Sequence, residues 1–255
     1  TMTPHLAGGF LSLLFMVSLA GQIFFGITAA FVTLYMSEDL ELLFVSPVSL
    51  RAVFSVKSLL VAGSNFLTAF LFAFVAGIFY GILFNGDAVF YLLVAVVGIS
   101  LWLMGTALAE LLNMVVMRIV PPHRSREAVG FIGALAGILI ALLFQVPNLL
   151  LAQEDSLDMG QWLASQDGLL EKMQYLPWGW ASQALVNGVS GSQLAGLGWS
   201  LLLLILGIAV FLTAFTLLER GFRRGWISLS QGAGGRRRKK QDEKETAAPV
   251  VQGAM

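Results

Sequence analysis

The sequence predicts an all-α membrane protein, a polytopic bundle of about five transmembrane helices, and three observations lead to this fold class. First, 57% of the residues are hydrophobic, only 12% are charged and the mean hydropathy is +0.82, which leaves too few polar side chains to coat a soluble domain. Second, four long segments carry no charge, and a helix needs roughly 20 apolar residues to cross a bilayer. These segments are 8–36, 58–86, 128–153 and 173–218. Third, the apolar runs are continuous rather than alternating, which excludes a membrane β-barrel.

Four of the expected spans follow from these uncharged runs, and a fifth, which contains Glu110, lies between the second and third runs. Asn85-Gly86-Asp87 is a tight turn, so the spans on either side of it should pack as antiparallel neighbours. Pro121 and Pro122 stop one helix before the next begins. The five expected spans lie at about residues 8–36, 58–84, 89–120, 128–146 and 194–218.

The basic residues are sorted between the two sides of the membrane. With five spans, 14 of the 15 lysines and arginines fall on one side, and Lys172 alone falls on the other, among acidic residues. Lys and Arg are enriched in cytoplasmic loops. We therefore expect the N-terminus of this chain outside and its C-terminus in the cytoplasm. No basic segment or cleavage site precedes the first span, so no signal peptide is expected.

The polar stretch 37–57 separates the first two expected spans. Its three acidic residues precede a turn at Ser46-Pro47, where a short amphipathic helix should end, and Ser49 can cap a second helix that continues into the next span. This helix–turn could act as a lever at the mouth of two spans, or it could be a plain elbow at the membrane surface. The charged residues of the stretch are Glu38, Asp39, Glu41, Arg51 and Lys57.

Two segments outside the spans have a distinct composition. The connection 147–193 is long and rich in Trp and Leu, and we expect short amphipathic helices along the outer interface. The chain after the last span turns amphipathic, then Gly-rich and then basic. We expect a transmembrane domain over 1–225 and a disordered cytoplasmic tail or linker over 226–255. Its basic run, 236–240, is either a positive-inside anchor or a contact for anionic lipid or a cytoplasmic partner.

Four polar residues interrupt the expected spans: Gln22, Asn65, Glu110 and Asn113. Ionisable residues inside membranes mark pathways or relays, but Glu110 lies about 33 Å along its helix from Ala88, near the cytoplasmic boundary. It could therefore be interfacial, or it could line a pathway together with Asn113. Interhelical hydrogen bonds are the simpler reading for Gln22 and Asn65.

Small residues recur at four-residue spacing and should mark close helix–helix contacts. They are Ala73, Gly77, Gly81, Gly133 and Gly137.

No catalytic set is visible in the sequence. The chain has no cysteine, and the expected topology puts His5 and His123 on opposite sides of the membrane. A G-x-x-x-x-G-K-[ST] phosphate loop is absent from the sequence. We therefore expect no catalytic, metal or cofactor site, and no nucleic-acid partner.

Three stretches resemble the ABC-2-type permeases, the membrane subunits of bacterial ABC exporters. Residues 39–57 resemble the cytoplasmic loop that carries the coupling helix in that family. The stretch 124–127, which includes Arg124 and Arg126, resembles its second cytoplasmic loop, and 176–181 resembles an extracellular stretch. Family halves have six spans, so this chain resembles an N-terminal half without its first span.

The resemblance implies a permease subunit in a bacterial cell membrane. A separate cytoplasmic ABC ATPase would bind ATP and Mg²⁺ and push on Glu38, Asp39, Glu41, Arg51, Lys57, Arg124 and Arg126. A second permease half or a second copy of the chain would complete the exporter within the lipid bilayer. The alternative is an accessory or scaffold membrane subunit that transports nothing.

Overall fold

The computed structural model describes residues 4–35, 49–119 and 172–246, together with isolated positions between 127 and 141. All the regular structure in these parts of the chain is helical, which confirms the all-α class. Four of the described helical segments are long and apolar enough to cross a membrane: Ala7–Thr33, Arg51–Leu83, Ala88–Val116 and Gln193–Arg220. The expected span 128–146 falls mostly outside the described residues, so the number five is not confirmed.

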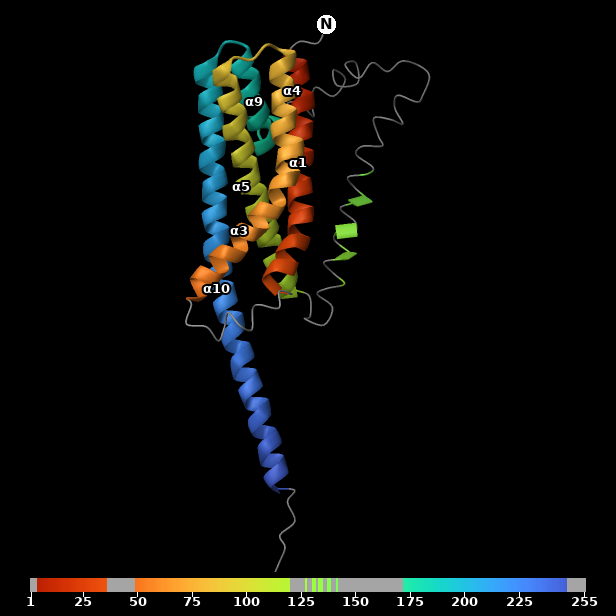
Figure 1. Ribbon diagram of the computed structural model, residues 1–255, viewed down its shortest axis with the longest axis vertical. Coiled ribbons are helices and arrows are strands. Elements are labelled where there is room, and N and C mark those ends of the chain that lie inside the picture. The colour runs from red at the N-terminus through yellow and green to blue at the C-terminus, as the bar shows by residue number, and fades with distance from the viewer. Residues whose placement is uncertain are drawn as a thin grey trace, which may run out of the picture.

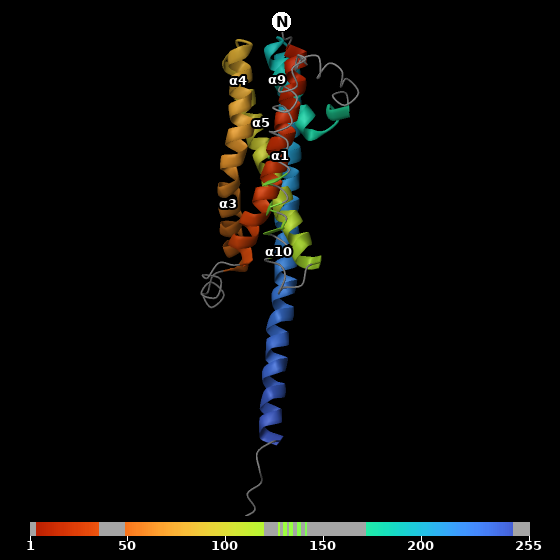
Figure 2. The same ribbon diagram turned by 90° about the vertical axis from the view of Figure 1, so that its right-hand side faces the viewer.

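The elements form an elongated bundle (Figure 1). In chain order the described elements are α1 (Pro4–Tyr35), α3 (Leu50–Ala69), the π-helix η1 (Phe70–Phe74), α4 (Val75–Leu83), α5 (Ala88–Ile119), α9 (Pro177–Val189) and α10 (Gln193–Thr246). The last residues of α1 and α5 and the first residues of α3 lie at the end of the bundle from which α10 projects (Figures 1 and 2). We call this the lower end.

The helix α3 begins where the sequence predicts. Ser49 has an extended backbone, and its side chain accepts a hydrogen bond of 3.3 Å from the backbone N–H of Ala52. This N-cap satisfies one of the free donors of the first turn. The capping prediction is confirmed, whereas the expected coupling helix before Ser49 lies outside the described residues.

The helices α3 and α4 form one continuous rod joined by η1. A single π-helical turn inside an α-helix is uncommon and often marks a functional site. Phe66 and Phe70 lie on this rod with their ring centroids 6.0 Å apart, and Phe66 meets Trp102 of α5 edge to face at 5.6 Å. The Trp102 indole N–H donates a 2.8 Å hydrogen bond to the Ala62 carbonyl. The rod is therefore fixed to α5 by an aromatic side chain just below the π-turn.

The turn between α4 and α5 makes these helices antiparallel neighbours, as predicted. Asn85 has a positive φ of 54°, which Asn tolerates better than most residues. The Gly86 N–H donates to the Gly81 carbonyl at 2.7 Å. Asp87 then caps α5 by accepting a 2.8 Å hydrogen bond from the Phe90 N–H.

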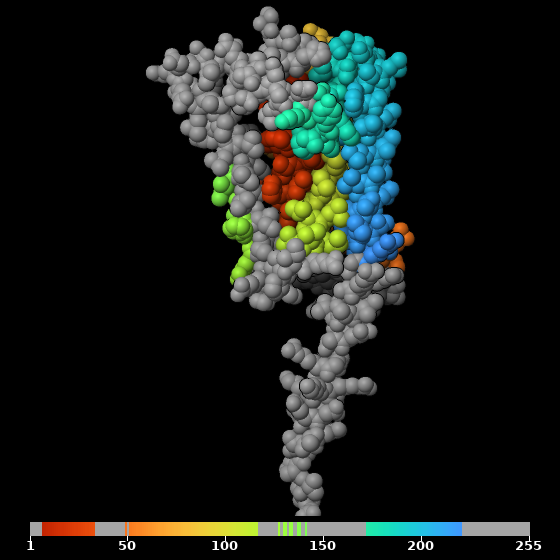
Figure 3. Space-filling view, turned by 180° about the vertical axis from the view of Figure 1, so that it is seen from behind, coloured from red at the N-terminus to blue at the C-terminus, as the bar shows by residue number. Residues whose placement is uncertain are grey.

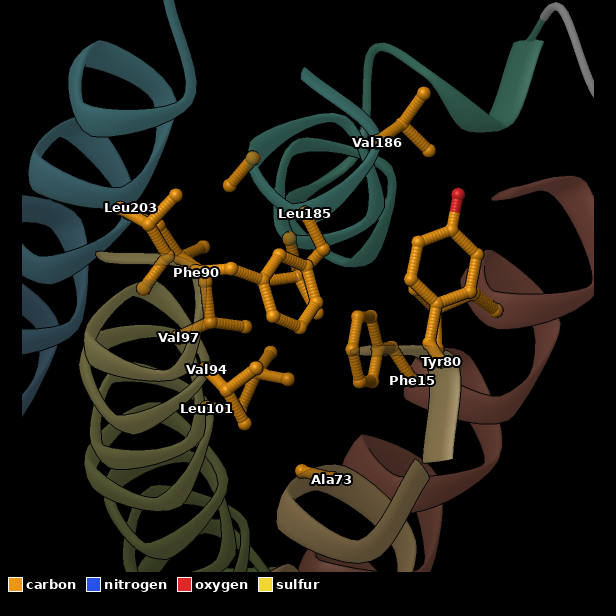
Figure 4. Packing of buried hydrophobic residues seen from close by; sticks show 14 of the residues in the cluster. Phe15, Ala73, Tyr80, Phe90, Val94, Val97, Leu101, Leu185, Val186 and Leu203 are labelled. Carbon is orange, nitrogen blue, oxygen red and sulfur yellow. The ribbon is translucent and has the colours of Figure 1, made fainter. Parts of the chain in front are cut away.

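The main apolar core lies in the upper half of the bundle. Figure 4 shows the ring of Phe90 between Leu185 of α9 and Phe15 of α1, and these three side chains are fully buried. Tyr80 of α4 stacks on Phe90 with ring centroids 6.2 Å apart. Inside a bilayer, close packing of such side chains, rather than their removal from water, holds the helices together.

The helix α9 lies inside this core, so the expected position along the outer interface is wrong for this part of the connection 147–193, while residues 147–171 lie outside the described residues. Seven of its residues are buried: Gly179, Ala181, Ser182, Ala184, Leu185, Val186 and Gly188. Most of these residues are small, which lets α9 pass close to α1 and α10. Ser182 donates a 2.6 Å hydrogen bond to the Gly8 carbonyl of α1. The prediction failed because the tryptophans of this segment suggested an interfacial position, while the small residues between them decide its packing.

The helix α10 is 54 residues long, or about 80 Å at 1.5 Å per residue. It packs along α5 and leaves the bundle at its lower end (Figure 1). Its backbone is helical to Thr246, within the segment whose composition predicted a disordered tail. Extending an existing helix needs no new nucleus, which explains why a Gly-rich segment can continue it. The division into a domain over 1–225 and a tail over 226–255 remains a prediction.

Candidate functional site

Seven polar side chains are buried together in the bundle, and we call this group the polar seam. Two come from α1, two from α3 and three from α5, and none is more than 2% exposed. They are Ser18, Gln22, Ser58, Asn65, Thr106, Glu110 and Asn113. Buried polar groups among apolar spans are costly, so the polar seam is the first candidate for a functional site.

Helical spacing brings these side chains onto facing surfaces. On α5, Thr106, Glu110 and Asn113 follow one another at intervals of four and three residues, which puts them on one face. On α3, Ser58 and Asn65 are seven residues, or two turns, apart. Because α3 and α5 run in opposite directions, Ser58 faces Glu110 while Asn65 faces Thr106.

Three hydrogen bonds hold the polar seam together. The Ser58 hydroxyl donates to Oε1 of Glu110 at 2.6 Å, and this is the shortest of the three. Asn65 Nδ2 donates to the Thr106 hydroxyl at 3.4 Å, near the limit for a hydrogen bond. Within α1, Nε2 of Gln22 donates to the Ser18 hydroxyl at 3.1 Å.

Two glycines let α1 approach the other two helices at the polar seam. A Cβ added to Gly105 of α5 would lie 2.5 Å from Oε1 of Gln22. A Cβ on Gly26 of α1 would lie 2.6 Å from the Ala109 Cβ and 2.9 Å from Nδ2 of Asn65. Real Cβ contacts are not that close, so these positions require glycine if the helices are to keep this spacing.

The polar seam is not fully satisfied by its own hydrogen bonds. Five of its atoms have no partner among the described residues: Gln22 Oε1, Asn65 Oδ1, Glu110 Oε2, Asn113 Oδ1 and Asn113 Nδ2. Leaving a buried polar group unpaired costs about 1–3 kcal/mol. Such a site favours a ligand, or a rearrangement of the helices, that supplies the missing partners.

The lower end of the bundle carries charged residues close to the polar seam. Nε of Arg51 on α3 lies 3.7 Å from a carboxylate oxygen of Glu219 on α10. One turn further into the membrane, Phe54 meets Phe215 with ring centroids 5.6 Å apart. Lys57, next to Ser58 in the sequence, is 6% exposed. The first turns of α3 are thus attached both to the polar seam and to α10.

The residues predicted from the sequence separate into three groups. Gln22, Asn65, Glu110 and Asn113 come together in the polar seam, where Glu110 is fully buried. Arg51 and Lys57 lie at the lower end, and their expected coupling role remains a prediction. Glu38, Asp39, Glu41, Arg124 and Arg126 lie outside the described residues.

The small residues expected to mark packing lie away from the polar seam. Ala73 is buried, and Cβ atoms added to Gly77 and Gly81 would lie 2.8 Å from a Val94 methyl and 2.5 Å from the Phe90 ring. A Cβ on Gly133 would lie 3.1 Å from the Thr28 hydroxyl, whereas none of the described atoms lies within 4 Å of one on Gly137.

Sequence reasoning missed Ser18, Ser58, Thr106 and the π-helix. The three hydroxyl residues were detectable, because Ser18 is one turn from Gln22, Thr106 is one turn from Glu110 and Ser58 is two turns from Asn65. The π-helix left no such signal, since Phe70–Phe74 reads as an ordinary apolar segment.

One family model matches the chain, over residues 2–252, and its description is “Putative ATP-binding cassette”. No curated protein and no solved structure is detectably similar to the chain. The match covers almost the whole sequence, and it points to partners in an ABC transporter.

This match overturns the resemblance to ABC-2-type permeases. The matching family is the ATP-binding cassette, so the expected function as an exporter permease subunit is wrong, and the scaffold alternative is not supported either. The expectations of no ATPase role and no ATP in this chain are wrong for the same reason. The resemblance depended on three short stretches, whereas the family model weighs residues 2–252 together.

Three cations are exposed among the residues whose side chains the structure describes: Arg51 at the start of α3, Arg220 of α10 and Lys172 before α9. Arg51 pairs with Glu219, so these three cations do not form one phosphate site. No group of three or more His, Cys, Asp or Glu residues that could hold a metal ion is found in the described ranges. The link to ATP comes from the family match, and by that match the chain belongs to the family described as “Putative ATP-binding cassette”.

Proposed function

We propose that the protein is a membrane-spanning component of an ATP-dependent system, and that its helices repack along the polar seam when ATP is used. The family match supports the dependence on ATP. The four described apolar helices support a position in the membrane. The proposal assigns no nucleotide contact to the described helices.

The observation that carries this proposal is the incomplete hydrogen bonding of the polar seam. A bundle with a single stable packing has little use for five buried polar atoms without partners among the described residues. A bundle with two packings can satisfy different members of the seam in each of them, because interfaces between packed helices switch between discrete arrangements. Of the three hydrogen bonds in the polar seam, the α3–α5 bond between Ser58 and Glu110 is the short one at 2.6 Å, whereas that between Asn65 and Thr106 is 3.4 Å.

The lower end is where such a movement would enter the bundle. Basic residues concentrate on this side of the membrane, so we assign it to the cytoplasm and the N-terminus of the chain to the outside of a bacterial cell membrane. Arg51 connects α3 to Glu219 of α10 here. The neighbouring acidic residues Glu38, Asp39 and Glu41 would face the cytoplasmic partners of the system.

The absence of cysteine makes this proposal testable by single-cysteine labelling. Ala62→Cys would report on the α3–α5 contact, because Ala62 is 3% exposed and its carbonyl accepts from Trp102. Leu67→Cys is the matched control, since Leu67 lies on the same helix and is 64% exposed. Each variant would be labelled with a maleimide in membranes, with and without ATP.

We expect ATP to change the labelling rate of the Ala62→Cys variant and to leave that of the Leu67→Cys variant unaltered. Binding of a fluorescent ATP analogue to the full-length chain would be measured in parallel, alone and together with proteins that co-purify. Equal labelling in both conditions, with no nucleotide bound in either preparation, would contradict the proposal.

A further inference from the structure

We infer that Glu110 is a proton-binding site: in this packing of α3 against α5 its carboxyl group holds a proton, which it releases when the two helices separate. This inference does not depend on the proposed use of ATP. It follows from the donors and acceptors of the polar seam and from the charges around it.

The polar seam has more unpartnered hydrogen-bond acceptors than donors. Among the seam atoms without a partner in the described residues, four are acceptor oxygens and one is a donor nitrogen. An ionised Glu110 would contribute acceptors only, whereas a protonated carboxyl contributes one O–H donor. Neither the side-chain oxygen nor the side-chain nitrogen of Asn113 has a partner among the described residues. Turning this amide group over would therefore still leave four acceptors and one donor without partners.

The Glu110 proton also has a candidate hydrogen-bond acceptor one helical turn away, the side-chain oxygen of Asn113. Asn113 follows Glu110 by three residues on the same face of α5, and its side-chain oxygen has no partner among the described residues. The other carboxyl oxygen of Glu110 already accepts from Ser58 at 2.6 Å. A protonated Glu110 can therefore accept with one oxygen and donate with the other.

The charges near Glu110 come from three helices. The described part of α1 around the polar seam carries no charged side chain, whereas α5 carries Arg118 two turns after Glu110. On α3 the charged groups are Arg51 and Lys57, and on the part of α10 inside the bundle they are Glu219 and Arg220. Arg51 faces Glu219, which leaves Lys57 and Arg118 as the cations whose removal must be tested.

Protonation and helix packing are then linked. An ionised carboxylate in an apolar span is costly unless water or a cation reaches it. A proton taken from the cytoplasmic water stabilises the closed α3–α5 contact, and separation of the helices hydrates Glu110 and returns the proton to that water. Raising the pH should therefore open the contact.

The first test is labelling with dicyclohexylcarbodiimide, an apolar reagent that reacts with protonated carboxyl groups in membranes. The full-length wild type, Glu110→Gln and Glu219→Gln would be treated at neutral pH in lipid vesicles, and the modified peptide identified by mass. We expect modification at Glu110 in the wild type and in Glu219→Gln, and its loss in Glu110→Gln. Gln keeps the acceptor for Ser58, so the Glu110→Gln variant should remain folded.

Two variations of this experiment can overturn the inference. If the wild type is not modified but Lys57→Met or Arg118→Met is, Glu110 is ionised and held by the cation that was removed. If sodium ions protect Glu110 from the reagent and potassium ions do not, the seam binds sodium rather than a proton.

The second test measures the pH dependence of the α3–α5 contact. Maleimide labelling of Ala62→Cys would be compared, at each pH, with the same cysteine in a Glu110→Gln background, which cancels the titration of the thiol itself. We expect the ratio of the two rates to rise several-fold towards alkaline pH. A ratio that stays constant with pH would overturn the linkage, even if Glu110 is modified by the carbodiimide.

Discussion

Ser58 and Glu110 are 52 positions apart in the sequence, yet the hydroxyl of the first donates a 2.6 Å hydrogen bond to the carboxyl of the second inside the bundle. This bond joins α3 to α5 in the lower part of the polar seam, one turn before Asn113 on α5. Because hydrogen bonds to a buried group are costly to remove from one side only, the pair gives a direct measure of how strongly the two helices are connected.

Ser58→Ala should lower the free energy of unfolding by about 1–3 kcal/mol, because it leaves Glu110 without its partner on α3. In a Glu110→Leu background the same substitution should cost less, since no buried carboxyl remains to be satisfied. Thermal unfolding of the four proteins of this double-mutant cycle, in one detergent, gives the coupling. Additive effects would mean that the bond contributes nothing to stability.

Gly105→Ala should destabilise the bundle by about 1–3 kcal/mol, because the added methyl group would lie 2.5 Å from Oε1 of Gln22. Gln22→Ala should relieve only part of this effect, because it removes Oε1 and Cδ but keeps the Gln22 Cβ, which would lie 2.8 Å from the added methyl group. Gly63→Ala is the matched control, since none of the described atoms lies within 4 Å of an added Cβ there, and Ala favours a helix over Gly by about 1 kcal/mol. The melting temperature should therefore fall for the first variant and rise or stay constant for the control.

The sequence predicts the elements of this fold better than their contacts. Uncharged runs locate α1, the rod of α3 and α4, and the first half of α10, because the length and polarity of a span are local properties. The turn at Asn85 was also predictable, since two antiparallel helices joined by three residues have to be neighbours. Convergence of the polar seam was not predictable, because it depends on the register between helices that Gly26 and Gly105 set.

Other errors have similar physical causes. The burial of α9 depends on small residues that fit between α1 and α10, and a reading based on tryptophans overlooks them. The family was misjudged because three short stretches of likeness were weighed more heavily than the whole chain, over which the ATP-binding cassette model matches residues 2–252.

Asp87→Ala should destabilise the upper end by about 0.5–2 kcal/mol, because it removes the N-cap of α5. One carboxylate oxygen accepts from the Phe90 N–H at 2.8 Å, and the other accepts from Nε2 of Gln193 on α10 at 2.6 Å. Asp87→Asn should recover most of the loss, since Asn is also a good N-cap. Equal melting temperatures for the Ala and Asn variants would contradict a capping role.

Gly179→Ala should release α9 from the core. An added Cβ at this position would overlap the backbone carbonyl oxygen of Met173, and backbone atoms cannot move aside as a flexible side chain can. The expected loss is about 1–3 kcal/mol, and α9 should become sensitive to an added protease. Gly198→Ala is the control, because none of the described atoms lies within 4 Å of its added Cβ. If both variants resist proteolysis as the wild type does, α9 is not held by the contact between Gly179 and Met173.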